Sequence, residues 1–107
     1  MKVLLDGCIP RKFKDYSAGQ DCSTVPEAGL AGKKNGELLS HAEYQGFEVF
    51  LTLDKGIQYQ QNLAQRRIAI VILRARSNRM IDLLPHADAC LAKIRSIKPG
   101  QIIRIGV

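Results

Sequence analysis

Short apolar runs alternate along this chain with polar segments and with stretches of helical periodicity. The runs KVLLD at 2–6, FEVFLTL at 47–53 and IAIVIL at 68–73 are dominated by apolar residues, which is typical of strands buried on both faces of a sheet. The third run is the strongest, and we expect it to lie at the centre of the sheet. A weaker strand is predicted at 21–25, and a last strand at 101–105.

Two longer segments have the three- and four-residue spacing of helices. The segment 35–45 places its apolar residues on one face, and Gly46 is expected to end it. From Met80 to Ile94 apolar residues recur at the same steps, and Pro85 should kink or split that helix. Pro10, after the first strand, suits the first turn of a further helix.

Strands that alternate with helical or loop crossovers indicate a parallel sheet covered by helices. The length of 107 residues suits one hydrophobic core, so we expect a single domain over 1–107. The predicted fold is an α/β three-layer sandwich, with a mostly parallel central sheet of about five strands and helices on both faces.

The composition, the cysteine spacing and the net charge narrow the expected cellular location and the kind of binding partner. With 46% hydrophobic and 24% charged residues the chain resembles an ordinary globular domain. No apolar run approaches the roughly 20 residues of a membrane helix, and MKVLLD reaches an acid too early for a signal peptide, so we expect a cytoplasmic protein without a membrane partner. The three cysteines lack C-x-x-C spacing and indicate no disulfide framework or zinc site. The net charge of +6 favours a polyanionic partner.

Three carboxylates follow successive strands. Asp6 comes directly after the first strand, Glu37 lies in the first turn of the helix after the second, and Asp54 follows the third. In open α/β sheets ligands bind beyond the carboxyl ends of the strands, where these residues are expected. Carboxylates about 4 Å apart repel by roughly 4 kcal/mol at a dielectric near 20, so a cluster needs a compensating cation.

Mg²⁺ or Mn²⁺ suits such a cluster, because both ions prefer oxygen ligands and leave positions open for phosphate. A metal-bound water could then attack a phosphodiester bond. The alternative is structural: Asp6 and Asp54 could cap the turns that follow them, and Glu37 could complement a helix dipole.

Cations and polar residues flank the same predicted edge. The candidates for contacts with a nucleic-acid backbone are Arg11, Lys12, Lys55, Arg74 and Arg76. Possible supporting polar residues of the acidic site are Asn35, Ser77 and Asn78. The polar segment 59–62 could stack on or bond to unpaired bases. For all of these the alternative is an ordinary solvated surface.

These residues lie within stretches that resemble a known family. LLDGCIP, KNGELLSHAEYQGFEVFLTLDKG, YQQNL and IVILRARSN are similar in order and spacing to small PIN-like domains related to the VapC toxins of toxin-antitoxin modules. The resemblance implies a central sheet of order 3-2-1-4-5 and metal-dependent ribonuclease chemistry, with Asp6, Glu37 and Asp54 at the matching acidic positions. Gly7 and Asn35 stand where such proteins often carry further acids.

The leading functional hypothesis is therefore an Mg²⁺- or Mn²⁺-dependent endoribonuclease, the toxin of a toxin-antitoxin pair. Its expected partners are RNA, a small antitoxin protein encoded nearby, and a second copy of itself. The alternative is a PIN-like module that binds RNA or protein without hydrolysis, as the replacements at Gly7 and Asn35 allow. A receiver-like signalling domain also groups acids at one edge of its sheet, but the chain has no obvious lysine after its last strand.

Overall fold

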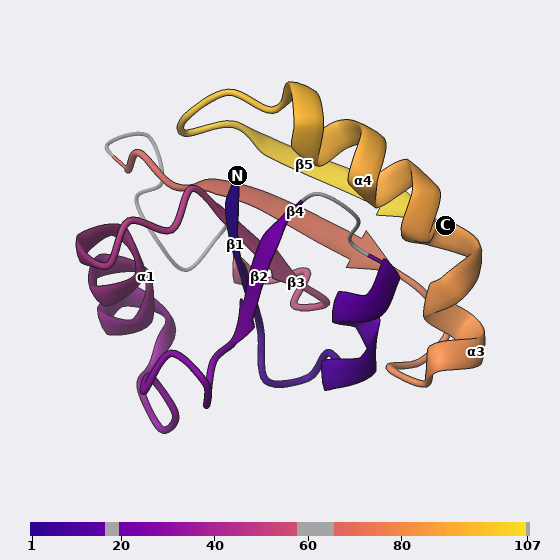
Figure 1. Ribbon diagram of the computed structural model, residues 1–107, viewed down its shortest axis with the longest axis horizontal. Coiled ribbons are helices and arrows are strands. Elements are labelled where there is room, and N and C mark those ends of the chain that lie inside the picture. Colours follow the sequence, from indigo (N-terminus) through magenta and orange to yellow (C-terminus); the bar gives the residue numbers. More distant parts are fainter. Residues whose placement is uncertain (17–19, 58–65, 107) are drawn as a thin grey trace.

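The computed structural model describes residues 1–16, 20–57 and 66–106, and only the backbone of Asn35. These residues form a five-stranded sheet in which every neighbouring pair of strands is parallel (Figure 1). The strands are β1 (Lys2–Leu5), β2 (Asp21–Thr24), β3 (Val49–Thr52), β4 (Ala69–Arg74) and β5 (Ile102–Gly106). The predicted α/β class, the parallel sheet and the position of each strand along the chain are thus confirmed.

Helices also form in the two segments where the periodicity predicts them, and a 3-10 helix follows Pro10. They are η1 (Arg11–Tyr16), α1 (Asn35–Tyr44), α3 (Met80–Leu83), η3 (Leu84–His86) and α4 (Ala87–Ser96). Pro85 lies in the 3-10 turn η3 and divides the amphipathic segment, as expected from its missing amide hydrogen. Gly46 follows α1 with a φ of 88°, a left-handed conformation that costs glycine little.

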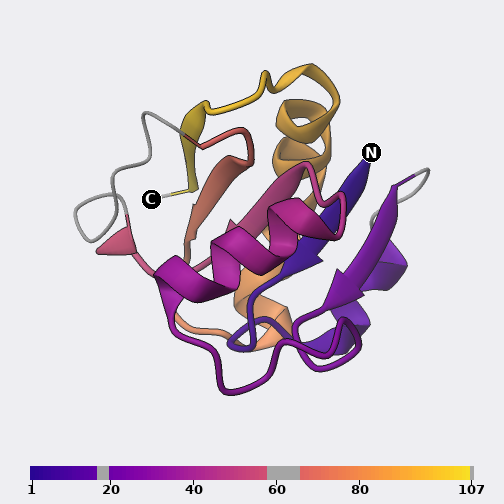
Figure 2. The same ribbon diagram turned by 90° about the vertical axis from the view of Figure 1, so that its left-hand side faces the viewer.

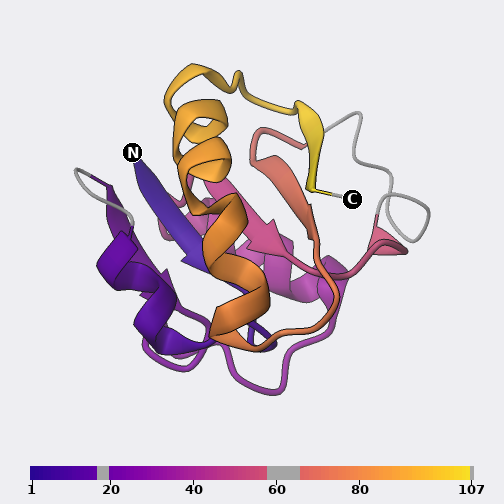
Figure 3. The ribbon, with the colours of Figure 1, turned by 90° about the vertical axis from the view of Figure 1, so that its right-hand side faces the viewer.

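Two groups of buried apolar side chains occupy the two faces of the sheet. Because side chains alternate along a strand, Val3 and Leu5 of β1 join one group and Leu4 joins the other. The first group contains residues of η1, α3 and α4, which Figure 3 shows in front of the sheet. The second contains residues of α1, which crosses the opposite face in Figure 2.

The strand order differs from the order that the family resemblance implies. It is β2-β1-β3-β4-β5, so the predicted order 3-2-1-4-5 is wrong. The Asp6 amide donates to the Leu51 carbonyl (2.9 Å) and the Glu48 amide to the Lys2 carbonyl (2.8 Å), which fixes β3 beside β1. All four residues of β3 are buried, whereas β2 buries only Thr24. A strand buried on all sides belongs inside a sheet, and the more polar β2 tolerates the edge.

The order also corrects the expected position of the most apolar strand. The central strand is β3, and β4 lies between β3 and the edge strand β5. Burial of β4 on both faces required an interior position but did not distinguish among the interior positions. Among the helices of the described ranges, none is long and apolar enough to cross a membrane.

Candidate functional site

The strand order creates a point at the carboxyl edge where successive connections leave in opposite directions. From β1 the chain moves to β2 on one side, and from β2 it returns past β1 to β3 on the other. In doubly wound sheets a crevice for ligands opens at this reversal, here between β1 and β3. Asp6 directly follows β1 and Asp54 follows β3 by two residues, so both lie beside the reversal.

Thr52 joins these two acids through its hydroxyl group. The Thr52 Oγ1 donates to the Asp6 Oδ2 at 2.6 Å and accepts from the Asp54 amide at 3.0 Å. Asp6 Oδ1 also accepts from the Gly7 amide (2.8 Å), and Asp54 Oδ1 from the Gly56 amide (2.9 Å). The structural alternative is thus also visible, because each acid accepts local amides as a turn-capping residue does.

Thr52 was not identified from the sequence. It is fully buried at the last position of an otherwise apolar strand. A buried hydroxyl requires a hydrogen-bond partner. A threonine at the end of an apolar strand, two residues before an acid, could therefore have indicated this contact from the sequence. Because Thr52 is fully buried, its hydrogen bond limits the orientations open to the Asp6 carboxylate.

Cys8 lies partly buried beside Asp6. Burial raises the pKa of its thiol above the usual 9.0, and the negative charge of Asp6 adds to the increase, while a hydrogen bond with the Leu53 backbone opposes it. At neutral pH the thiol therefore keeps its proton. Hard oxygen donors, and not a thiolate, characterise this edge of the sheet.

Glu37 has different partners. Its Oε1 accepts from Lys33 Nζ at 3.0 Å and lies 4.0 Å from His41 Nε2, and its side chain is 58% exposed. The hydrogen bond from Lys33 holds the pKa of this carboxyl below its ordinary value. Within residues 1–16, 20–57 and 66–106, no three His, Cys, Asp or Glu side chains are grouped closely enough to hold a metal ion. The structure thus links Asp6 and Asp54 through Thr52 beside the reversal point and does not bring Glu37 into their group.

The loop after β4 leaves the same edge and contributes polar groups. Ser77 Oγ donates to Asp82 Oδ2 at 2.6 Å and accepts from the Arg79 amide at 3.0 Å. Through this bond Asp82, in α3, lies beside the loop that follows β4. Arg74, Arg76 and Asn78 are exposed around this loop.

The predicted cations after β1 line a cavity. A hollow of about 480 Å³ is lined by Arg11, Lys12, Lys14 and Asp15 of η1. Lys55 is exposed directly after Asp54. The polar residues 59–62 lie outside the described residues, as does the side chain of Asn35.

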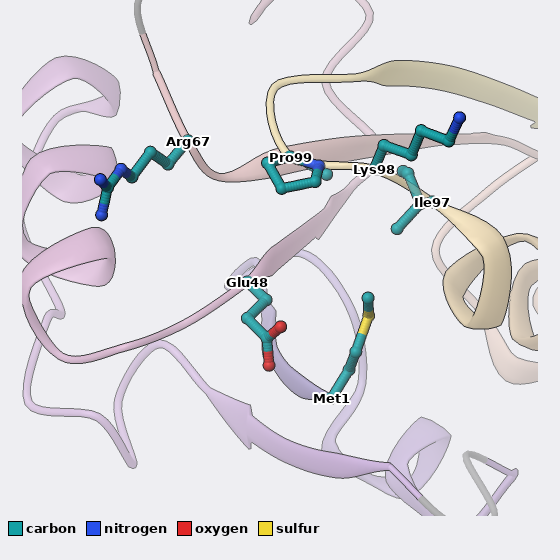
Figure 4. A pocket seen from close by; sticks show the side chains of 7 residues that line it. Met1, Glu48, Arg67, Ile97, Lys98 and Pro99 are labelled. Carbon is teal, nitrogen blue, oxygen red and sulfur yellow. The ribbon is translucent and has the colours of Figure 1, made fainter.

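A smaller cavity opens at the opposite, amino edge of the sheet. It measures about 90 Å³ and is lined by Met1, Glu48, Arg67, Ala69, Ile97, Lys98 and Pro99. In Figure 4 the side chains of Arg67 and Lys98 extend away from each other and from the hollow. Sites for small molecules usually exceed about 300 Å³ and have converging polar groups, so this cavity is a poor candidate.

The carboxyl edge therefore carries two linked carboxylates beside the reversal point and exposed arginines after β4, and the connection from β1 to β2 adds a cationic hollow. Oxygen donors of this type fit a divalent ion such as Mg²⁺ or Mn²⁺. Comparisons with protein families, curated proteins and solved structures find no match to this chain.

Proposed function

We propose that the chain is an Mg²⁺- or Mn²⁺-dependent endoribonuclease whose site lies between the carboxyl ends of β1 and β3. The observation that carries the proposal is the position of Asp6 and Asp54 on either side of the reversal point, linked by the buried Thr52 hydroxyl. One or two carboxylates with water commonly suffice to hold Mg²⁺ in proteins. Such an ion would activate water and neutralise charge on a phosphodiester.

Glu37 enters this proposal as an outer carboxylate. Its oxygen now accepts from Lys33, and it would have to exchange this cation for the metal or for a water next to the metal. Arg11, Lys12, Lys55, Arg74 and Arg76 would hold the RNA backbone by charge, with Ser77 and Asn78 as polar neighbours. Asn35, at the start of α1, would complete the supporting polar groups.

The cellular setting is proposed on the family resemblance alone. The protein would act in the cytoplasm as the toxin of a toxin-antitoxin pair, silenced by a small antitoxin protein, and would form a homodimer.

The two apolar groups of residues support a three-layer arrangement of helix, sheet and helix.

RNA cleavage by the purified protein tests the function. We expect cleavage with Mg²⁺ or Mn²⁺ and none with EDTA, and loss of activity in Asp6→Asn and in Asp54→Asn. Asp88→Asn is the matched control, because it removes an exposed carboxylate of α4 and should leave cleavage unchanged. Full cleavage by either site variant would refute the assigned residues.

One observation favours a second function, namely binding of RNA or protein without hydrolysis. Among the described residues the acids form no group of three, and Glu37 is engaged by Lys33. A module of this kind would bind RNA in a salt-dependent manner and leave it intact with either metal. The cleavage assay, run beside a binding assay, distinguishes the two functions.

A further inference from the structure

The sequence of η1, RKFKDY, arranges its side chains in rows. Residues three apart eclipse each other in a 3-10 helix, so Arg11 lies over Lys14, Lys12 over Asp15, and Phe13 over Tyr16. Phe13 is 2% exposed and anchors the helix on the first apolar group of residues. The two charged rows consequently lie on the outer sides of η1.

Glu27 fixes one charged row in place. Its carboxylate accepts from Lys14 Nζ at 2.9 and 3.0 Å and lies 3.3 Å from Arg11 Nε. It is held by Thr24, whose amide donates to Glu27 Oε1 (2.9 Å) and whose Oγ1 accepts from the Glu27 amide (3.2 Å). This is a capping-box arrangement. The two cations are thus positioned in advance, while the Arg11 side chain remains 78% exposed.

Lys12 belongs to the other row and is exposed on the cavity wall. It makes no ion pair with any other residue that the structure describes. The cavity lining carries three cations and Asp15, so it retains positive charge even beside Glu27. A phosphate is the anion that an arginine and lysines recognise best.

Tyr16 supplies an aromatic surface at the end of the same helix. It is 49% exposed, although its row begins at the buried Phe13. Tyr16 does not itself line the cavity, but it directly follows Asp15, which does. Sites for single-stranded nucleic acids commonly combine cations with exposed aromatic rings, because every base can stack on such a ring. The cavity is open on one side, and its volume of about 480 Å³ is sufficient for one small anionic group.

From these features we propose that η1 binds one nucleotide of single-stranded RNA, with its phosphate in the cavity against Arg11, Lys12 and Lys14 and its base outside the cavity against the exposed ring of Tyr16. A nucleotide in a duplex would first have to leave the stack, which costs a few kcal/mol. The site thereby selects unpaired RNA. The proposal deepens the ribonuclease function, on which the choice of RNA as the polyanion rests.

The chain length between Asp6 and η1 limits how far the cavity can lie from the acidic pair. After Asp6 the chain turns at once, with the Ile9 amide donating to the Asp6 carbonyl at 2.9 Å. Arg11 comes five residues after Asp6, so their Cα atoms are at most about 17 Å apart. An RNA strand held at η1 would therefore have to span no more than a few nucleotides to reach Asp6.

Fluorescence anisotropy in EDTA tests this site without cleavage. We expect a labelled oligouridylate to bind about tenfold more tightly than an RNA duplex of the same length, a difference of about 1.4 kcal/mol. Lys12→Ala should lower the salt slope of binding by about 0.7, the loss of one phosphate contact. Tyr16→Ala should weaken binding about tenfold, and Tyr16→Phe should restore it.

The matched controls are Lys93→Ala on α4 and Tyr44→Ala on α1, both exposed and both expected to bind as the wild type does. Equal losses in the controls, equal affinity for duplex, or equally tight binding of polyglutamate with the same dependence on Lys12 would overturn the proposal. Cleavage with Mn²⁺ but no binding preference in EDTA would refute the η1 site alone. The expected binding without cleavage would refute the ribonuclease function and leave the η1 site standing.

Discussion

Thr52 illustrates how a single polar atom can organise the candidate site. Its side chain is completely buried, yet its hydroxyl contacts one acid through a side chain and the other through the backbone. A hydroxyl in this position has both a donor and an acceptor role to fulfil, and the two acids satisfy both. The separation of the two acidic residues is therefore coupled to the packing of β3.

Replacing Thr52 by valine should preserve the shape of the core and remove this link. We expect the free energy of unfolding to fall by about 1 kcal/mol, because Asp6 Oδ2 and the Asp54 amide each lose a partner. Affinity for Mn²⁺ should fall as well, since Asp6 is no longer oriented. Urea denaturation and calorimetry measure the two effects. Thr52→Ser is the control that keeps the hydroxyl, and wild-type behaviour of the valine variant would contradict this role.

Gly7 offers a direct way to strengthen the site. A side chain added there meets no atom within 4 Å, so glutamate should be accommodated. A further carboxylate beside Asp6 adds an oxygen donor and negative charge, and we expect Gly7→Glu to increase Mn²⁺ affinity. Gly7→Gln adds the same bulk without the charge and should not do so. Unchanged calorimetric affinity of Gly7→Glu would argue against a metal at Asp6.

At the scale of elements, Glu27 connects η1 to the turn after β2, and this connection predicts a pH dependence. Hydrogen bonds from the Thr24 amide and then Lys14 lower the pKa of Glu27 from 4.5 to about 2. A lowered pKa stabilises the folded state above the unfolded value, so this stabilisation is complete above about pH 4.5 and is lost as the pH falls toward 2.

Glu27→Gln should therefore be less stable than the wild type at neutral pH, and the difference should shrink between pH 4.5 and 2. Urea unfolding over this range gives the difference directly. Asp88→Asn removes a carboxylate that does not join these elements and serves as the reference. A difference between wild type and Glu27→Gln that stays constant with pH would contradict the assignment.

Gly106 allows β5 to lie against the end of β4. Its φ of 104° is a conformation that other residues rarely adopt, and an added Cβ would overlap the Arg74 carbonyl oxygen. Gly106→Ala should lower the free energy of unfolding by more than about 1 kcal/mol, because it adds backbone strain and a clash. Thermal unfolding of Gly106→Ala is compared with that of Gly7→Ala, whose added Cβ has open space around it. This comparison separates the strain at Gly106 from the effect of replacing any glycine by alanine.

The elements themselves were largely predictable because their signals are local. Pro85 divides the last helical segment and Gly46 ends α1, each through the geometry of its own backbone. The strand order was not predictable in this way. The position of β3 depends on pairing with β1 and β4, whose residues are distant in sequence, and an apolar run does not specify its neighbours.

The same distinction applies to the site at the scale of the whole molecule. Asp6 and Asp54 follow strands, so the parallel sheet alone directs both to one edge. Glu37 extends from a helix, where the direction of a side chain depends on rotation about the helix axis and on nearby charges. Lys33, four residues before it and just ahead of α1, provides a partner. The helical periodicity of the sequence could not show whether the Glu37 carboxylate would pair with Lys33 or bind a metal ion.

Metal binding by the whole domain should appear as stabilisation, because an ion that binds only the folded state shifts the unfolding equilibrium. At a Mn²⁺ concentration 100 times its dissociation constant the increase should be about 2.7 kcal/mol. Asp6→Asn and Asp54→Asn should each remove most of this increase, whereas Glu37→Gln should retain it, because Glu37 is paired with Lys33 and lies outside the group of Asp6 and Asp54. Thermal unfolding with and without Mn²⁺ measures all four proteins under the same conditions.

An increase in the Asp6 and Asp54 variants equal to that of the wild type would place the ion elsewhere on the chain. No increase in the wild type would mean that the cationic edge is a binding surface without metal chemistry.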